Sequence, residues 1–118
     1  MSKPSSWPLP ANSARYVVPR SLVKRLDQHP LSSELYPLGM GHYVQAMGHA
    51  MERESHDDYL LIYCIAGRGS LTVGQRHGYL KGGQLLLLPR GLTHAYAADD
   101  DDPWTIYWMH VSGPQLAN

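Results

Sequence analysis

The sequence predicts a single all-β domain, built as a jelly roll or small barrel with at most one short helix. Three observations support this prediction. From Leu35 onward the apolar residues fall in short segments, glycine-rich turns separate these segments, and only one stretch of the chain has helical spacing. A chain of 118 residues can bury one core but not two, so we expect one domain.

Eight short apolar segments are the candidate strands. They are 35–40, 42–50, 59–66, 70–75, 77–81, 85–89, 93–98 and 104–112. The turns between them are marked by glycines, a residue that allows backbone conformations closed to other side chains. Eight strands at this spacing are typical of a jelly roll.

The segment 83–96 predicts a buried strand followed by a tight corner. Its four leucines, 85–88, form a continuous apolar run, which is typical of a strand covered on both faces. Pro89 cannot donate to a sheet ladder and should end the strand, and a glycine two residues later supplies the corner. His94 and Tyr96 then lie two residues apart, on one face of the next strand.

The N-terminal part of the chain has a different character. Residues 1–13 hold three prolines and a tryptophan, which excludes a helix or a central strand. We expect an N-terminal arm there, followed by one domain over 14–118. After Pro19, apolar residues at helical spacing predict one short helix over 21–28.

Composition excludes several classes of function. Ten basic and ten acidic residues balance, and the pI is near 7, so no basic surface for nucleic acid is expected. The single cysteine, Cys64, allows no internal disulfide and fits a reducing compartment. The chain has no apolar run of the roughly 20 residues that a membrane helix needs, and its first residues lack the apolar core of a secretion signal. We therefore expect a cytoplasmic protein with no membrane partner.

Two resemblances follow from these motifs. The 83–96 segment resembles the second conserved motif of the cupins, which are barrels of the double-stranded β-helix (jelly roll) type. From about Leu35 to Gly113 the chain is similar to the ligand-sensing, N-terminal domain of AraC-family transcription regulators. The matching segments, in chain order, are 38–43, 49–53, 59–69, 89–96 and 103–113.

The resemblance implies a role. In AraC-family regulators this domain binds a small effector, often a sugar, inside the barrel. Helices after the barrel pair two subunits, and a C-terminal pair of helix-turn-helix motifs reads DNA. The chain stops at Asn118, before such helices, so we expect it to be a piece of a longer, homodimeric regulator that reaches DNA only through the missing domain. The resemblance implies no catalysis and no cofactor.

Period-two geometry and the resemblance together indicate a sugar-like ligand site. The last candidate strand places Trp104, Ile106, Trp108 and His110 on one face. The resemblance implies that Trp108 lies under the bound sugar, so this face should be the interior one. Ile106 stands where the arabinose-binding member has a histidine that binds a hydroxyl, and it removes that polar contact.

Four further residues complete the predicted ligand set. Arg53 matches an arginine at the rim of the family's pocket, where its planar fork of donors can hold two neighbouring oxygens. Tyr96 matches a tyrosine whose hydroxyl can bond to the ligand, and His49 shares parity with Arg53 in an extended segment. Pro8 lies in the arm that folds over occupied sugar in the family; a disordered tail is the alternative.

Alternative interpretations stay open at this point. Trp108 can be a core residue, and His94 can be a structural residue of the corner. A metal-dependent cupin enzyme would use Glu54, His56 and His94 as a facial triad, although a leucine, Leu60, replaces the glutamate expected of such enzymes. A stand-alone small-molecule-binding cupin is the third interpretation.

Overall fold

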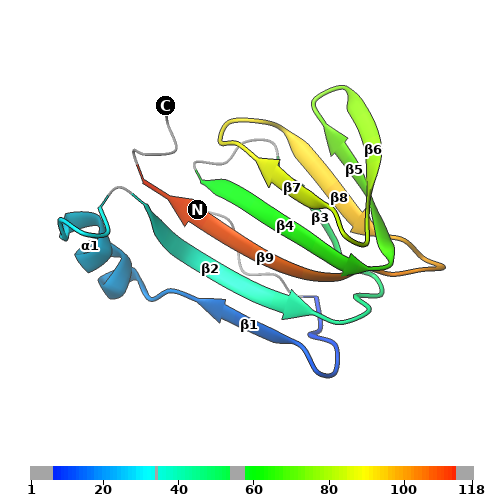
Figure 1. Ribbon diagram of the computed structural model, residues 1–118, viewed down its shortest axis with the longest axis horizontal. Coiled ribbons are helices and arrows are strands. Elements are labelled where there is room, and N and C mark those ends of the chain that lie inside the picture. Colours follow the sequence, from blue (N-terminus) through cyan, green and yellow to red (C-terminus); the bar gives the residue numbers. More distant parts are fainter. Residues whose placement is uncertain (1–6, 34, 54–57, 114–118) are drawn as a thin grey trace.

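The computed structural model describes residues 7–33, 35–53 and 58–113. Two antiparallel sheets lie face to face with one helix beside them (Figure 1). The elements in chain order are β1 (Ala14–Val17), α1 (Arg20–Gln28), β2 (Tyr36–Tyr43), β3 (Ala50–Arg53), β4 (Tyr59–Ala66), β5 (Arg68–Val73), β6 (Arg76–Lys81), β7 (Leu85–Leu88), β8 (His94–Ala98) and β9 (Thr105–Ser112). The all-β cupin-type jelly roll predicted from the sequence is confirmed.

The strand order follows the alternation of a jelly roll between its two sheets. The larger sheet has the order β1-β2-β9-β4-β7 and the smaller one β3-β8-β5-β6. The last strand, β9, is therefore the central strand of the larger sheet, between β2 and β4. The inward side chains of β2, β9 and β4 therefore face the same interior.

The core lies between the two sheets and consists of the side chains that the strands point inward. Its fully buried members include Leu60, Ile62, Leu88, Trp104 and Ile106. Cys64 is also fully buried, and burial raises the pKa of its thiol. A protonated, buried thiol behaves as a small apolar group, as the sequence predicts.

Six of the eight predicted strands appear within two residues of their expected bounds. The prediction of separate strands at 35–40 and 42–50 is wrong, because β2 runs unbroken over Tyr36–Tyr43 and β3 begins only at Ala50. Gly39 and Gly41 do not form a turn. The missing side chain of Gly41 makes room for the ring of Trp108, because a methyl group on Gly41 would overlap that ring.

Two N-terminal elements differ in detail from the prediction. The helix begins one residue early, at Arg20, directly after Pro19. Strand β1 is not predicted by the sequence pattern, and it forms by pairing with the edge of β2, with Arg15 opposite Gly41. Within the described ranges no helix is long and apolar enough to span a bilayer.

The predicted burial of β7 on both faces is only half correct. Leu88 faces the core and is 2% exposed, but Leu85 and Leu87 on the opposite face are 62% and 51% exposed. The strand is the edge of the larger sheet, and no described element covers its outer side. The apolar run therefore reflects one buried face and one open apolar face.

Candidate functional site

The inner face of β9 carries the aromatic wall that the sequence predicts. Trp104 and Ile106 are fully buried, and Trp108 is half-buried and packs against the core cluster. Tyr107, on the opposite face, is 50% exposed. Trp104 and Ile106, both members of the predicted ligand set, thus form the floor of the interior, whereas Trp108 combines an inward ring with accessible surface.

The position of Trp108 is fixed by its neighbours on β2. Gly41 is its register partner, and the indole lies directly against that glycine. The Trp108 N–H is buried, and no acceptor among the described residues meets the geometry of a full hydrogen bond with it. The Trp108 N–H lies close enough to the hydroxyl of Tyr43 to oppose the rise in the pKa of Tyr43 that burial causes. A buried donor without an acceptor is an uncommon feature that a ligand oxygen would satisfy.

Three charged or titratable side chains form a cluster, and one of them, His110, contacts the Trp108 ring. Asp58 lies at the centre: its Oδ1 is 3.5 Å from Nη2 of Arg53, and its Oδ2 is 3.0 Å from Nδ1 of His110. Nη1 of Arg53 is 3.5 Å from the same His110 nitrogen. The side chains of Arg53 and Asp58 are each 9% exposed, and the His110 ring meets the Trp108 ring edge-on at 5.4 Å. We call Arg53, Asp58 and His110 the polar triad.

The sequence predicts only one member of the polar triad as a site residue. His110 could have been added, because period-two geometry places it on the face of Trp108. Asp58 gives no such signal, since an acidic residue just before a strand is usually solvated. Its role depends on the pairing of β4 with β9, which brings Leu60 opposite His110.

Tyr96 completes the ring of polar groups from the other sheet. It is 7% exposed, and burial raises the pKa of its hydroxyl, while the charge of Arg53 opposes this rise. Met51 is its register partner on β3, two residues before Arg53. Tyr96 therefore stays protonated at neutral pH, as a hydroxyl that can donate and accept.

His49 occupies the centre of an aromatic cluster. The rings of Trp7, Tyr43, Tyr96 and Trp104 lie within 6.0 Å of its ring. Its Nδ1 accepts a hydrogen bond of 3.3 Å from the indole N–H of Trp104. Burial lowers the pKa of His49 to about 4, so the ring is neutral at physiological pH and holds the cluster together as an acceptor.

The described part of the N-terminal arm rests on this cluster. Trp7 lies 5.0 Å from the ring of Tyr43 and donates its indole N–H to the Met47 carbonyl. Arg15 donates to the Trp7 carbonyl over 3.4 Å. Pro8, the arm residue named by the resemblance, is exposed.

The alternative metal site cannot be placed as a whole. Glu54 and His56 lie outside the described residues. His94 is 1% exposed, and its Nδ1 lies 3.2 Å from the carbonyl of Leu92 within the corner. Among residues 7–33, 35–53 and 58–113 no group of three His, Cys, Asp or Glu side chains is arranged to hold a metal ion.

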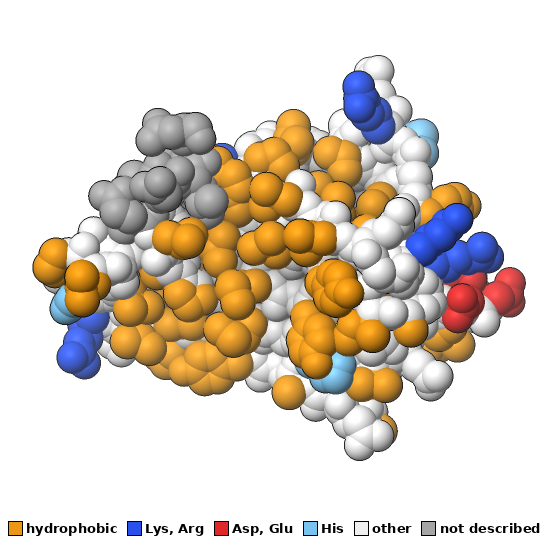
Figure 2. Space-filling model, viewed as in Figure 1, with side chains coloured by type: hydrophobic (Ala, Val, Ile, Leu, Met, Phe, Trp, Pro, Cys, Tyr) orange, Lys and Arg blue, Asp and Glu red, His pale blue; other side chains and the backbone are white. Residues whose placement is uncertain are grey.

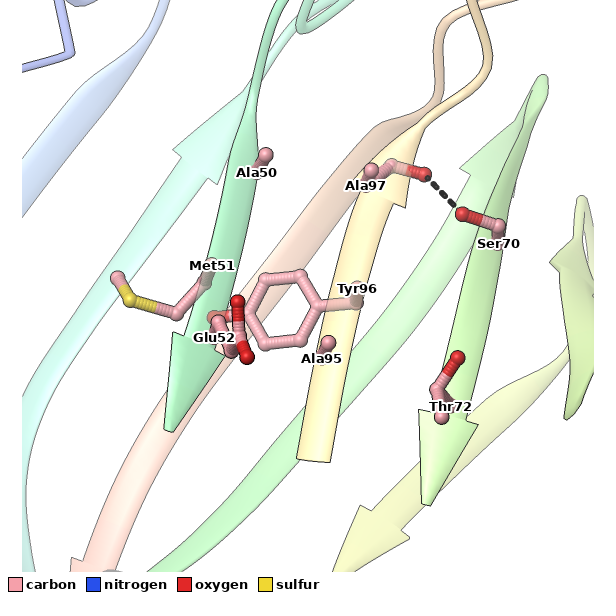
Figure 3. A pocket seen from close by; sticks show the side chains of 8 residues that line it. All are labelled: Ala50, Met51, Glu52, Ser70, Thr72, Ala95, Tyr96 and Ala97. Carbon is pink, nitrogen blue, oxygen red and sulfur yellow. Dashed lines mark hydrogen bonds between the residues drawn. The ribbon is translucent and has the colours of Figure 1, made fainter. Parts of the chain in front are cut away.

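A depression lies on the outer side of the smaller sheet, over β3, β8 and β5 (Figure 3). Its volume is about 320 Å³, and its polar lining consists of Glu52, Ser70, Thr72 and the edge of Tyr96. The Ser70 hydroxyl donates to the Ala97 carbonyl, as the dashed line shows. Apart from Tyr96 it shares no residue with the predicted ligand set.

Comparison with known proteins agrees with this architecture. Residues 37–118 match the family described as the AraC-like ligand binding domain. The MmsAB operon regulatory protein of Pseudomonas aeruginosa is 50% identical over 117 residues, which are 96% of this chain and 38% of that protein. The Msm operon regulatory protein of Streptococcus mutans is 29% identical over 86 residues, 70% of this chain and 31% of that protein. The chain thus spans well under half the length of these regulators.

Solved structures confirm the fold alone. A cupin 2 conserved barrel domain protein from Salinispora arenicola has a TM-score of 0.58 at 17% identity, over 99% of this chain and 92% of that one. The plu4264 protein from Photorhabdus luminescens has the same TM-score at 15% identity, over 100% and 92%. Together with the aromatic wall of β9 and the family match over more than half of its length, these comparisons show that the chain belongs to the AraC-like ligand binding domain family.

Proposed function

We propose that this chain is the effector-sensing part of a transcription regulator, and that its effector is a small, neutral, polyhydroxylated molecule of the sugar class. The observation that carries the proposal is the contact between Trp108 and His110, through which the indole adjoins the polar triad. An apolar ring face and a group of rigid donors and acceptors lie side by side within one barrel. A pyranose has the matching chemistry, because its faces carry C–H groups and its edge carries hydroxyls.

The composition of the polar triad favours a neutral ligand over an anion. Arg53 supplies donors for neighbouring oxygens, and Asp58 beside it supplies acceptors. Because Asp58 already balances the charge of Arg53, a carboxylate ligand would have to displace it, whereas a hydroxyl can bond to both. Tyr96 and the N–H of Trp108 add one hydroxyl and one donor.

The names of two further relatives support the same ligand class. The raffinose operon transcriptional regulatory protein of Pediococcus pentosaceus and the lactose operon transcription activator of Staphylococcus xylosus are each 33% identical to this chain. The matches cover 48% and 44% of it. The MmsAB regulator, which matches far more of the chain, has a name that mentions no sugar.

The proposed mechanism is a shift in population between placements of the N-terminal arm. Trp7 packs on Tyr43 and His49, and Tyr43 in turn contacts the ring of Trp108 at 5.7 Å. A ligand over Trp108 would favour one arm placement if it binds that placement better than the other. In a homodimeric cytoplasmic regulator of the same length as the relatives, this shift would alter DNA binding through the polypeptide outside this chain. The protein would have no catalytic role.

The test is a thermal-shift screen with pentoses, hexoses and their sugar acids. We expect neutral sugars among the hits, because a ligand that binds only the native state raises the midpoint of unfolding. The hit should be lost in Arg53→Lys, which keeps the charge but loses the planar fork. The control is Tyr79→Ala on β6, an exposed position away from the polar triad. A hit that persists unchanged in Arg53→Lys, or a screen in which only anions bind, would overturn the proposal.

A metal assay separates the enzymatic alternative. Elemental analysis of the purified chain is expected to find no stoichiometric iron, manganese or zinc. A near-stoichiometric metal content that falls in His94→Ala would instead favour the metal-dependent cupin.

A further inference from the structure

His110 is a polar residue on the inward face of β9, two positions after Trp108. The outward residues of the same stretch, Tyr107 and Met109, are apolar. Figure 2 shows hydrophobic side chains gathered over β2, β9, β4 and β7 on the side turned to the viewer. An antiparallel sheet with one solvated side usually carries its polar side chains outward. A partly buried imidazole is costly unless its nitrogens are satisfied, so their partners indicate its role.

The Nδ1 atom of His110 has two neighbours with opposite requirements. The carboxylate oxygen Oδ2 of Asp58 lies 3.0 Å away and can only accept a hydrogen bond. Nη1 of Arg53 lies 3.5 Å away and can only donate one. Nδ1 satisfies one of these neighbours at a time, because it either carries a proton or offers a lone pair. The place of the His110 proton therefore depends on which neighbour forms the stronger hydrogen bond.

The distances favour the hydrogen bond to Asp58. Each contact involves one ionised group, so charge assistance does not separate them. The separation from Asp58 is normal for a hydrogen bond, whereas that from Arg53 is at the long limit. Arg53 also keeps a second partner, because its Nη2 lies 3.5 Å from the other carboxylate oxygen of Asp58. Nδ1 of His110 therefore carries the proton and donates it to Asp58.

A proton on Nδ1 leaves the other ring nitrogen, Nε2, as a bare acceptor in the neutral imidazole. Nε2 forms no hydrogen bond with any described residue, and it is not among their fully buried polar atoms. The His110 side chain is 20% exposed, and its ring meets the Trp108 ring edge-on at 5.4 Å. An accessible acceptor thus belongs to a ring that contacts Trp108.

We propose that His110 determines the specificity of the effector site, and that Asp58 is the positioning residue that makes its Nε2 an acceptor. The inference rests on the proposed function, because it takes a polyhydroxylated effector to lie on Trp108. A hydroxyl can donate to Nε2 and still accept from a donor such as the Trp108 N–H. An ether, a carbonyl or a carboxylate in the same place has no proton to donate and leaves Nε2 unsatisfied, so His110 disfavours such ligands.

Removal of the carboxylate charge should reverse this requirement. In Asp58→Asn, Arg53 becomes the only charged neighbour of Nδ1 within the polar triad, and Nδ1 then accepts its N–H. The proton moves to Nε2, which becomes a donor. A variant in this state prefers ligands that carry an acceptor where the unaltered chain requires a hydroxyl.

The first test needs no effector. Long-range nitrogen–proton correlation spectra of the 118-residue chain distinguish Nδ1–H, Nε2–H and the imidazolium, and the loss of signals in His110→Gln assigns this ring. At neutral pH we expect Nδ1–H in the unaltered chain and in Asp101→Asn, a control in an exposed loop, but Nε2–H in Asp58→Asn. Nε2–H or an imidazolium in the unaltered chain would overturn the proposal even if Asp58→Asn folded poorly.

The second test measures specificity by calorimetric titration. The pentose or hexose with the largest thermal shift is compared with its monodeoxy and O-methyl derivatives. At one hydroxyl, either change should weaken binding about tenfold or more in the unaltered chain, but less than about threefold in His110→Phe, which keeps a flat ring and no nitrogen. The matched control, His77→Phe on the exposed face of β6, should discriminate as the unaltered chain does.

The outcomes separate this inference from the proposed function. Discrimination that His110→Phe leaves unchanged at every hydroxyl would overturn the role of His110 while sugar binding itself stands. If no neutral sugar binds, the proposed function fails, and with it the role of His110 in specificity. An Nδ1–H tautomer that gives way to Nε2–H in Asp58→Asn, together with the loss of discrimination in His110→Phe, would support the proposal.

Discussion

The indole of Trp108 lies directly against Gly41, its register partner on the neighbouring strand β2. A side chain on Gly41 would overlap the ring, so the glycine determines where the ring rests. Gly41→Ala should push the indole out of place and weaken effector binding at least tenfold. Such overpacking should also lower the free energy of unfolding by about 1–3 kcal/mol.

Gly78 on β6 provides the matched control for this change. A methyl group there meets no atom within 4 Å. Gly78→Ala should leave binding unchanged and alter the unfolding free energy by less than about 1 kcal/mol. Chemical denaturation and ligand titration on both variants check the prediction, and equal binding by Gly41→Ala and the unaltered chain would contradict it.

Asp58 should set both the stability of the polar triad and its preference for neutral ligands. Asp58→Asn leaves Arg53 charged and nearly buried without its counter-charge, which should cost roughly 3 kcal/mol of unfolding free energy. The freed guanidinium should then bind sugar acids more tightly and neutral sugars more weakly. Asp101→Asn, in an exposed loop, is the control. If Asp58→Asn left the unfolding free energy and the relative affinities for neutral sugars and sugar acids unaltered, the ion pair would have no such role.

The neutral state of His49 makes stability depend on pH. The pKa of His49 is about 4 in the folded chain and about 6.5 as a model value, so the unfolded state binds the extra proton between these limits. The resulting stabilisation is complete above pH 6.5, declines as the pH falls towards 4 and changes no further below that. The loss amounts to about 3 kcal/mol in order of magnitude.

The contribution of His49 can be isolated with His49→Gln. This variant keeps an acceptor for the Trp104 N–H but does not titrate. Between pH 7 and pH 4 the unfolding free energy of the unaltered chain should fall by about 3 kcal/mol more than that of the variant. Urea denaturation over this range measures the difference; parallel pH profiles would contradict a buried, neutral His49.

Much of the inner wall could be predicted, because it depends only on the alternation of side chains between the two faces of a strand. Once β9 is recognised as a strand, Trp104, Ile106 and Trp108 must share one face and Tyr107 the other. The structure places them so. The sequence does not indicate how deeply each side chain is buried, since this depends on the strands opposite. Trp104 and Ile106 are fully buried and lie beneath the surface that a ligand could contact.

The features missed by sequence reasoning all depend on partners far away in the chain. Gly41 falls between two of the predicted strands, but its lack of a side chain makes room for the ring of Trp108, some 70 residues later. Asp58 can be recognised as a site residue only from its contact with His110. Strand β1 can be recognised only from its pairing with the edge of β2. Likewise, the leucine run of β7 does not reveal that one of its faces stays open.

The indole N–H signals of the three tryptophans test the central claim most directly. In an amide and indole nitrogen–proton correlation spectrum, Trp108→Phe identifies the Trp108 signal by its loss. Titration with the best neutral sugar from the screen should move that signal progressively to saturation, because its N–H gains an acceptor. The Trp104 signal should move far less, since its N–H already bonds to His49. A Trp108 signal that stays in place while the sugar saturates the protein would contradict a ligand resting on this ring.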